Sequence, residues 1–390
     1  MCCADLAKRY VRAVWRARGL GGIRETSPRS SFAVLLQNSK NHMAEPRIIA
    51  IDAMGGDHGV PVIVPGAAMA LASHPGIGFV LCGNRTAIEA ELKAFPGLAA
   101  ASRIVHTDTA ISMQDKPSQA VRRGKGTSMW LALEQVKEGA AQAALSAGNT
   151  GALMAMSKLV LRPMAGIERP AIAAFWPTVR GVSIVLDVGA NIGASARQLA
   201  EYALMGAAMA RAYLKIERPR VGLLNVGVEE IKGADEVKQA HAWLKLPELG
   251  LPIDYRGFVE GDQIGQGDVD VVVVEGFAGN IALKTAEGTA RQIGVYLREA
   301  MTQSMITKIG ALLARPGFRT LRHKMDPRRV NGGVFLGLDG IAVKSHGGTD
   351  AFGFASEINV GYEMAAGDLK GRIASDLGAF NGKLAAIPEN

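Results

Sequence analysis

Short apolar runs alternate along most of the chain with longer segments in which apolar residues recur at helical spacing. The runs with the length and composition of strands are 47–52, 77–83, 102–107, 142–148, 182–189, 220–227 and 269–276. Several are continuous in Val, Ile and Leu, which is typical of strands covered on both faces. Segments such as 126–140 and 198–215 have the periodicity of amphipathic helices. This alternation predicts an α/β fold with a mostly parallel sheet.

Glycines and polar residues follow the carboxyl ends of these strands. Ligands of open α/β sheets bind outside this edge. The residues found there are Asp52 to Asp57, Gly148, Asn149, Thr150, Gly151, Asp187, Gly189, Asn191, Asn225, Gly227, Lys232, Glu275 to Asn280, and His346. Because so many strand ends share this character, the sequence predicts one shared binding cleft.

The stretch Gly148-Asn149-Thr150-Gly151 stands where a strand hands over to a helix. It can be a tight turn in which Asn149 or Thr150 caps the helix. It can also hold an anion, because the first N–H groups of a helix are free and glycines admit close approach. The local sequence leaves both interpretations open.

The bulk composition is that of a globular protein able to bury a large core, with 390 residues, 48% hydrophobic and 21% charged. Three cysteines in no metal-ligand or disulfide spacing favour a reducing cytoplasm. The formal charge is +8, but residues 1–42 hold eight basic against two acidic residues and so carry +6 of it. A basic nucleic-acid-binding surface on the remainder is therefore not supported.

We interpret residues 1–42 as a basic extension: an organellar presequence, a disordered arm or the product of too early a start codon. They lack the apolar core and cleavage-like site of a secretory signal. Met43 precedes the first strand closely, so we expect one domain over 43–390. No run reaches the roughly 18 apolar residues that a membrane-spanning helix needs.

The segment 296–329 differs in character from the rest. Leu297, Met301, Met305, Ile309 and Leu312 recur at spacings that place them on one helical face. We expect Pro316-Gly317 to end this helix. The basic residues that follow or precede this break are Arg315, Arg319, Arg322, Lys324, Arg328 and Arg329. The stripe either faces the core or belongs to a protruding hairpin that meets an anionic membrane or an acidic partner.

Several motifs together resemble the phosphate acyltransferase family, whose members convert acyl-acyl carrier protein and inorganic phosphate to acyl phosphate. They are IDAMGGDHG, PSQAVRRGKGTSM, SAGNTGALM, GIERPA, LDVGAN, GLLNVGVEEIKG, EGFAGNIALKT and KSHG, in order from about Arg47 to about Glu363. The resemblance implies a three-layer α/β/α sandwich similar to the phosphotransacetylase and isocitrate dehydrogenase-like group, with a protruding helical hairpin.

The resemblance also implies roles and partners. Lys232 and Asn280 would be catalytic, while Gly148, Asn149, Thr150, Gly151, Asp187, Asn191, Asn225 and His346 would bind phosphate or substrate. If the segment 296–329 forms a hairpin, as its own pattern allows, we expect contact with membrane or carrier protein from Leu312, Leu313, Arg315, Phe318, Arg319 and Arg322. No metal or cofactor is implied. The family implies a cytoplasmic homodimer bound peripherally to an anionic membrane, working with acyl carrier protein, inorganic phosphate and a downstream acyl phosphate:glycerol-3-phosphate acyltransferase.

One position departs from the family pattern. Relatives usually read GANVD, and this chain has Gly193 in place of the aspartate. We expect the missing carboxylate to change how the cleft binds the acyl group or phosphate, and to affect the acyl-transfer chemistry less.

Each site residue also has a purely structural interpretation. Without the resemblance, Lys232 reads as a solvated lysine of a charged loop and Asn280 as a turn residue. Asp187 is as well suited to bracing its loop as to touching ligand. Asp52, Asp57, His58 and His346 match no compact metal-ligand spacing.

Two other functions compete with an acyltransferase. A nicotinamide-dependent dehydrogenase on a similar fold would need a dinucleotide fingerprint, and no GxGxxG follows a strand. A non-catalytic scaffold for membrane or carrier protein is the other alternative, motivated by Gly193.

Overall fold

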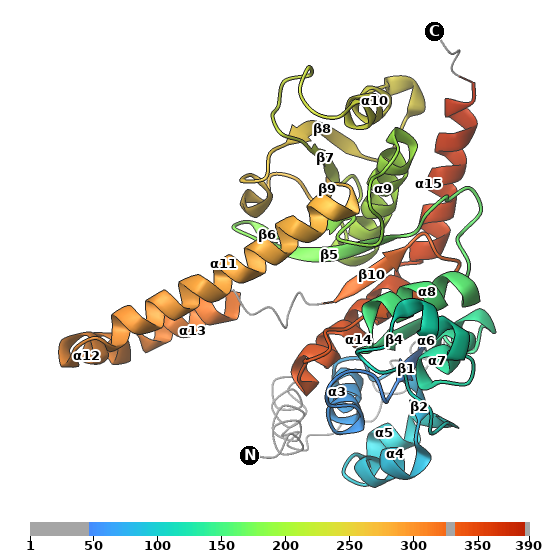
Figure 1. Cartoon of the computed structure of the whole chain (residues 1–390), viewed down its shortest axis with the longest axis vertical. Coiled ribbons are helices and arrows are strands. Elements are labelled where there is room, and N and C mark those ends of the chain that lie inside the picture. The colour runs from blue at the N-terminus through green and yellow to red at the C-terminus, as the bar shows by residue number, and fades with distance from the viewer. Residues whose placement is uncertain (1–46, 325–331, 387–390) are drawn as a thin grey trace, which may run out of the picture. The chain divides into compact units, whose positions relative to one another are not determined.

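The computed structural model describes residues 47–324 and 332–386, without the side chains of 319, 320 and 322–324. The expectations for residues 1–42 fall outside this part. The described chain forms two compact units (Figure 1). Unit 1 ends at Leu161 and regains Gly340–Ala366, and unit 2 contains Arg162–Asp339 and the segment from Gly367 onward.

Unit 1 is built on parallel strands in the order β3-β2-β1-β4-β11. Helices α7 and α14 both pack against β1 and β4, and α3 packs on α14. The strands are β1 (Arg47–Asp52), β2 (Ile77–Gly83), β3 (Ser102–His106), β4 (Ala143–Ser146) and β11 (Ile341–Lys344). The helices are α3 (Val60–Ser73), α4 (Arg85–Leu92), α5 (Pro96–Ala100), α6 (Pro117–Arg123), α7 (Ser128–Lys137), α8 (Thr150–Val160) and α14 (Ala351–Ala366).

Unit 2 has the strand order β10-β5-β6-β9-β7-β8, in which β6, β9, β7 and β8 are mutually parallel. Strand β5 is antiparallel to both β10 and β6. The strands are β5 (Ala171–Thr178), β6 (Gly181–Leu186), β7 (Arg220–Leu224), β8 (Asp254–Val259), β9 (Val271–Val273) and β10 (Gly333–Leu336). The helices are α9 (Ala196–Met209), α10 (Asp235–Leu244), α11 (Gly276–Thr302), α12 (Met305–Leu313), α13 (Arg315–Lys324) and α15 (Leu369–Leu384).

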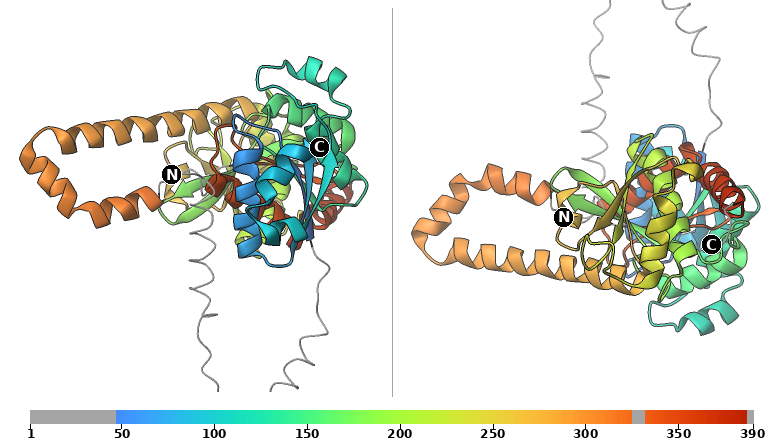
Figure 2. Two further views of the ribbon diagram at one scale, coloured as in Figure 1. Left: turned by 90° about the horizontal axis from the view of Figure 1, so that it is seen from below. Right: turned by 90° about the horizontal axis from the view of Figure 1, so that it is seen from above.

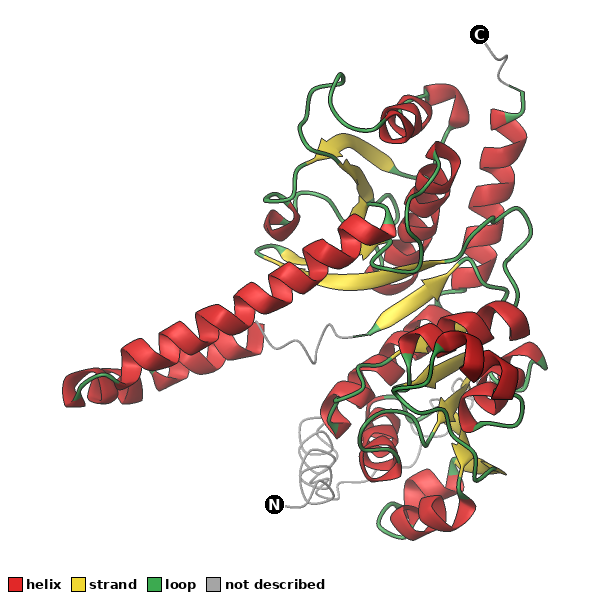
Figure 3. Cartoon of the chain, viewed as in Figure 1, coloured by secondary structure: helices red, strands yellow, loops and turns green. Residues whose placement is uncertain are grey.

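The apolar runs predicted the strands well. Every run expected from the sequence forms a strand, and the central β1, β4, β6 and β9 are almost wholly buried. The periodic segments 126–140 and 198–215 contain α7 and α9, and a π-helical turn extends α9 to Leu214. The α/β/α class predicted from the sequence is confirmed, with a mostly parallel sheet and helices between the strands (Figure 3).

Helices α11, α12 and α13 form the protruding hairpin (Figure 2). Helix α11 runs away from the sheet, α12 lies at the far end, and α13 returns. Helix α11 buries only Gly276 and Gly279, and α12 buries none of its residues. The core-facing interpretation of the apolar stripe is therefore wrong for α12.

Two further details of the expected helix are wrong. The stripe is divided, because Ser304 caps a new helix by accepting a hydrogen bond from the Thr307 N–H and donating its own N–H to Thr307 Oγ1. The helix break expected at Pro316-Gly317 falls slightly earlier, because α12 ends at Leu313 and α13 begins at Arg315. Pro316 is the second residue of α13, and the first turn is where a missing N–H does no harm.

Candidate functional site

The predicted residues of unit 2 gather at one edge of its sheet. Strands β6, β9 and β7 are neighbours and run parallel, so the loops that follow them begin side by side. These loops carry Asp187 and Asn191 after β6, Asn280 after β9, and Asn225 and Lys232 after β7. These polar residues therefore lie at one edge of the unit 2 sheet, and the shared binding cleft stays a prediction.

The Asp187 carboxylate organises the loop after β6. Its Oδ1 accepts hydrogen bonds from the N–H groups of Ile172 (3.0 Å), Gly189 (3.1 Å) and Ala190 (2.9 Å). Its Oδ2 accepts from the Asn191 N–H (2.9 Å) and lies 3.0 Å from Asn191 Nδ2. The side chain is fully buried, and burial raises the pKa of its carboxyl. Both oxygens are taken up within the fold, so the geometry assigns Asp187 to bracing the loop.

Asn191 continues this network inward. Its Nδ2 lies 2.9 Å from the Pro170 carbonyl oxygen and 3.0 Å from the Tyr202 hydroxyl. The side chain is 7% exposed. Asn191 therefore ties the loop to α9 and to the start of β5.

The first turn of α11 lies unusually close to this loop. A Cβ at Gly279 would stand 1.9 Å from the Asp187 carbonyl oxygen, and one at Gly276 would stand 2.2 Å from the Asn191 carbonyl oxygen. Only glycine permits this approach. It sets the exposed Asn280 against the loop, where Asn280 Nδ2 donates to the Val188 carbonyl oxygen at 3.1 Å.

Glu275 caps α11, a role that the sequence analysis missed. Its carboxylate accepts from the N–H groups of Ala278 (2.6 Å) and Phe277 (2.9 Å), and also from that of Gly193 (3.0 Å). Gly193 has a φ of +70°, a conformation that glycine adopts without strain. Gly193, the position at which the resemblance leads us to expect aspartate, is thus tied through its backbone to the start of α11.

The loop after β7 is closed by Asn225, which holds Lys232 in place. Asn225 Nδ2 lies 3.1 Å from the carbonyl oxygens of both Gly227 and Lys232. Lys232 Nζ lies 2.9 Å from Glu229 Oε2, with about half of the lysine side chain exposed. The Glu229 hydrogen bond raises the pKa of Lys232, so its ammonium stays charged near neutral pH. Both side chains lie over Gly227, where a Cβ would stand 2.5 Å from Lys232 Cδ.

A corresponding edge in unit 1 joins the ends of β1, β4 and β11. Ser146 Oγ donates to Asp52 Oδ2 at 2.6 Å and accepts from the Gly148 N–H at 3.0 Å. Burial raises the pKa of Asp52. Asp52 therefore supports the turn that begins at Gly148, and no group of three or more potential ligands that could hold a metal occurs among the described residues.

Asn149 is the cap of α8. Its Oδ1 accepts from the Ala152 N–H at 3.0 Å, and its Nδ2 lies 2.9 Å from the carbonyl oxygens of Met113 and Asp115. The capping interpretation is therefore confirmed. The N–H groups of Thr150 and Gly151 lie in the first turn of α8, and N–H groups of a first turn have no acceptor within the helix.

His346 and its neighbours follow β11. His346 is exposed, and its Nδ1 accepts from the Gly348 N–H at 3.2 Å. Two buried residues nearby were not predicted: burial lowers the pKa of Lys344 to about 8 and raises that of Glu357 to about 8. Lys344 Nζ donates to the Ala147 carbonyl oxygen at 3.3 Å, next to Gly148. The short apolar run 341–343, which directly precedes Lys344, was the sequence signal that could have placed Lys344 at the end of a strand.

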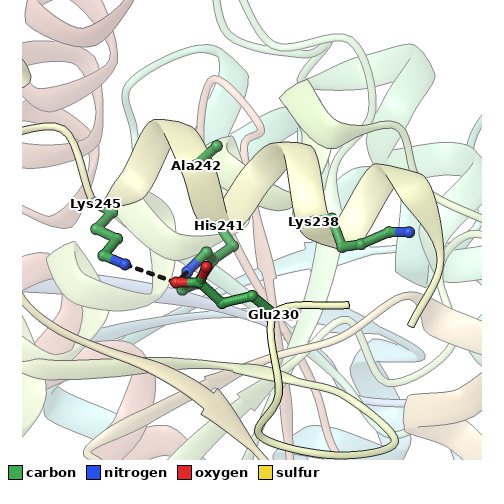
Figure 4. Close-up of a pocket in the computed structure, with 5 residues that line it drawn as sticks. All are labelled: Glu230, Lys238, His241, Ala242 and Lys245. Atoms are coloured by element: carbon green, nitrogen blue, oxygen red, sulfur yellow. Dashed lines mark hydrogen bonds and ion pairs between the residues drawn. The ribbon is translucent and has the colours of Figure 1, made fainter. Parts of the chain in front are cut away.

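A pocket of about 260 Å³ lies beside α10 (Figure 4) and contains none of the predicted site residues. Glu230 reaches across from the Lys232 loop and pairs with Lys245 at 2.8 Å. His241 Nδ1 lies 2.8 Å from the Tyr255 hydroxyl, and burial lowers the pKa of His241. The ion pair between Glu230 and Lys245 thus attaches the outer side of the loop that carries Lys232 to α10.

Three of the predicted contact residues of the hairpin are exposed, and a fourth that the structure describes is half-buried. Leu312 is 65% and Leu313 77% exposed. Arg315 is exposed and Phe318 half-buried, whereas the side chains of Arg319 and Arg322 lie outside the described part. Among the described residues, no helix is both long and apolar enough to cross a membrane.

Comparisons with known proteins agree with the motifs. Residues 48–372 match the sequence model of the family described as "Fatty acid synthesis protein". A phosphate acyltransferase of Afipia carboxidovorans is 59% identical over 350 residues, which is 89% of this chain and 98% of that protein. The phosphate acyltransferase of Xanthobacter autotrophicus is 60% identical over 336 residues, covering 86% and 94% respectively.

Solved structures of similar fold are phosphotransacetylases. The EutD phosphotransacetylase of Staphylococcus aureus is 16% identical with a TM-score of 0.54, covering 86% of this chain and all of that one. A phosphotransacetylase of Streptococcus pyogenes is 16% identical with a TM-score of 0.55, covering 87% and 99%. These structures agree with the α/β fold, and the sequence matches go further: the chain belongs to the phosphate acyltransferase family of fatty acid synthesis proteins.

Proposed function

We propose that the protein transfers a long-chain acyl group from acyl carrier protein to inorganic phosphate. The products are acyl phosphate and free carrier protein, and the acyl phosphate serves a downstream acyl phosphate:glycerol-3-phosphate acyltransferase in phospholipid synthesis. The observation that carries this proposal is the match to phosphate acyltransferases over most of the chain, with Lys232 and Asn280 held at neighbouring strand ends.

The reaction requires positioning and charge stabilisation. A phosphate oxygen attacks the thioester carbon, the new C–O bond forms, the C–S bond breaks, and the thiolate leaves and takes a proton. The Lys232 ammonium has three N–H donors and uses one on Glu229, so others remain for phosphate or for the developing oxyanion. The Asn280 amide uses one N–H on Val188 and can offer its second to the same charge. The proposal involves no metal or redox cofactor.

Other predicted residues contribute in two ways. The N–H groups of Thr150 and Gly151 in the first turn of α8 suit an anion such as phosphate. Gly148 donates its own N–H to Ser146 Oγ and contributes by letting the anion approach the backbone closely. His346 offers a further exposed donor. Asp187, Asn191 and Asn225 act by positioning, because the Asp187 carboxylate and the Nδ2 groups of both asparagines are hydrogen-bonded within the loops that carry or support Asn280 and Lys232.

The hairpin supports a peripheral role at a membrane. Met305, Ile306, Ile309, Leu312 and Leu313 are all more than half exposed on α12. An apolar helix face without protein cover fits the boundary between headgroups and acyl chains. We propose that this tip contacts the anionic inner face of the cell membrane in a cytoplasmic homodimer, and that the adjacent arginines attract lipid or the acidic carrier protein.

The proposed activity is tested with purified protein, palmitoyl-acyl carrier protein and phosphate. We expect release of free carrier-protein thiol that depends on phosphate, without nucleotide or metal. The assay follows thiol with a chromogenic reagent and acyl phosphate with hydroxylamine. A dehydrogenase would instead require a nicotinamide cofactor, and a scaffold would release no thiol; either result would refute the proposal.

Replacing the two catalytic candidates tests their roles. We expect Lys232→Ala and Asn280→Ala each to lower kcat by about a hundredfold or more, the scale of losing one preorganised donor. Both side chains are substantially exposed, so circular dichroism and melting should remain normal. Lys238→Ala is the matched control, because Lys238 also pairs with an acidic residue three positions earlier. Near-normal kcat in both variants would rule out these roles.

The hairpin tip is tested with Leu312→Asp combined with Leu313→Asp. Because both side chains are exposed, we expect a melting temperature within about 2 °C of the wild type. Binding to anionic liposomes should be lost in a flotation assay, since each charge would be driven against the hydrocarbon boundary. Leu159→Asp, at an exposed leucine of α8, serves as control. Undiminished liposome binding by the double variant would contradict a membrane role.

A further inference from the structure

The segments that carry the candidate catalytic residues of unit 2 also carry large apolar side chains that are exposed to solvent. They come from the segments after β6, β7 and β9, and each is between 50% and 87% exposed. They are Ile192, Val226, Val228, Ile231, Phe277 and Ile281. Single exposed apolar residues are ordinary, but six of them on the segments after three neighbouring strands favour a binding surface there.

These residues alternate along the chain with the polar groups of the site. Ile231 directly precedes Lys232, and Asn280 lies between Phe277 and Ile281. The strands before these loops are hydrogen-bonded neighbours. The apolar surface therefore borders the groups that the proposed reaction uses.

The outward direction of these side chains is fixed by their backbones. Asn225 closes the loop that carries Val226, Val228 and Ile231, through hydrogen bonds to the carbonyl oxygens of Gly227 and Lys232. Asp187 holds the turn that leads to Ile192. Because the main chain is pinned, turning these side chains inward would break several hydrogen bonds, and the exposure is part of the fold.

We propose that this apolar surface receives the hydrocarbon chain of the acyl thioester. The inference rests on the proposed function. In an acyl thioester the hydrocarbon chain is covalently attached to the carbonyl carbon, and the proposed reaction places this carbonyl at Lys232 and Asn280. The first carbons of the chain must therefore lie against the residues that border Lys232 and Asn280. Apolar side chains there favour a longer chain, because each buried methylene adds to binding. The surface thus determines the preference for chain length.

Other occupants fit less well. The hairpin offers a separate apolar set on α12 for lipid. A second copy of the chain covering the surface would block access to Lys232, which is about half exposed and would need to meet substrate.

The test compares acyl-acyl carrier protein carrying four or sixteen carbons. We expect Val226→Asn combined with Val228→Asn to lower the ratio of kcat/KM for sixteen over four carbons by about tenfold or more, the scale of a few lost methylene contacts. Val179→Asn is the matched control, because Val179 is 83% exposed in the turn between β5 and β6, away from the loops after β6, β9 and β7. It should leave the ratio unchanged.

Several results would overturn the inference. An equal loss for both chain lengths would mean that the surface does not contact the chain. If the wild type sediments as a dimer and the variant as a monomer, the surface belongs to an interface with a second copy. If the variant loses binding to liposomes, the surface belongs to a lipid contact. If the wild type turns over neither thioester, the proposed function itself fails. If it turns over both and the variant keeps the same ratio, only this inference fails.

Discussion

The carboxylate of Asp187 is the interaction on which the candidate site of unit 2 depends. Its two oxygens accept hydrogen bonds from backbone N–H groups of Ile172, Gly189, Ala190 and Asn191, so a tight loop forms directly after β6. That loop is the surface against which the glycines of α11 pack. Burying a carboxylate is costly, and several hydrogen bonds compensate the cost. The result is a rigid loop whose Val188 carbonyl oxygen accepts the hydrogen bond from Asn280.

Much of this arrangement could be predicted from the sequence, because the strongest physical signals are local. Short apolar runs such as that in 182–189 indicated strands, since short runs rich in Val and Ile are typical of strands covered on both faces. Glycine and polar residues after these runs indicated the loops that carry Asn225, Lys232 and Asn280. The order of neighbouring strands was not predictable, because pairing of β6, β9 and β7 joins segments far apart in the chain.

The misses have identifiable causes. Strands β10 and β11 have four residues each and were not singled out, and β8 contains charged residues and a glycine that interrupt an apolar run. Glu229 was not singled out, although it pairs with Lys232, and Glu275 was placed at a strand end without its role as the cap of α11. The division of the hairpin at Ser304 was missed because an apolar stripe continues across it, while the cap depends on a single side chain. Such interactions depend on geometry that composition does not reveal.

The central claim is that close contact between α11 and the Asp187 loop places Asn280 for chemistry. The direct measurement is kcat for phosphate-dependent thiol release by Gly279→Ala, beside Gly294→Ala in the same helix. A Cβ at Gly279 would collide with the Asp187 carbonyl, whereas one at Gly294 would meet nothing within 4 Å. We predict a fall of about tenfold or more for Gly279→Ala, since small displacements of a catalytic group are costly, and wild-type kcat for Gly294→Ala. Wild-type kcat in a folded Gly279→Ala protein would contradict the account.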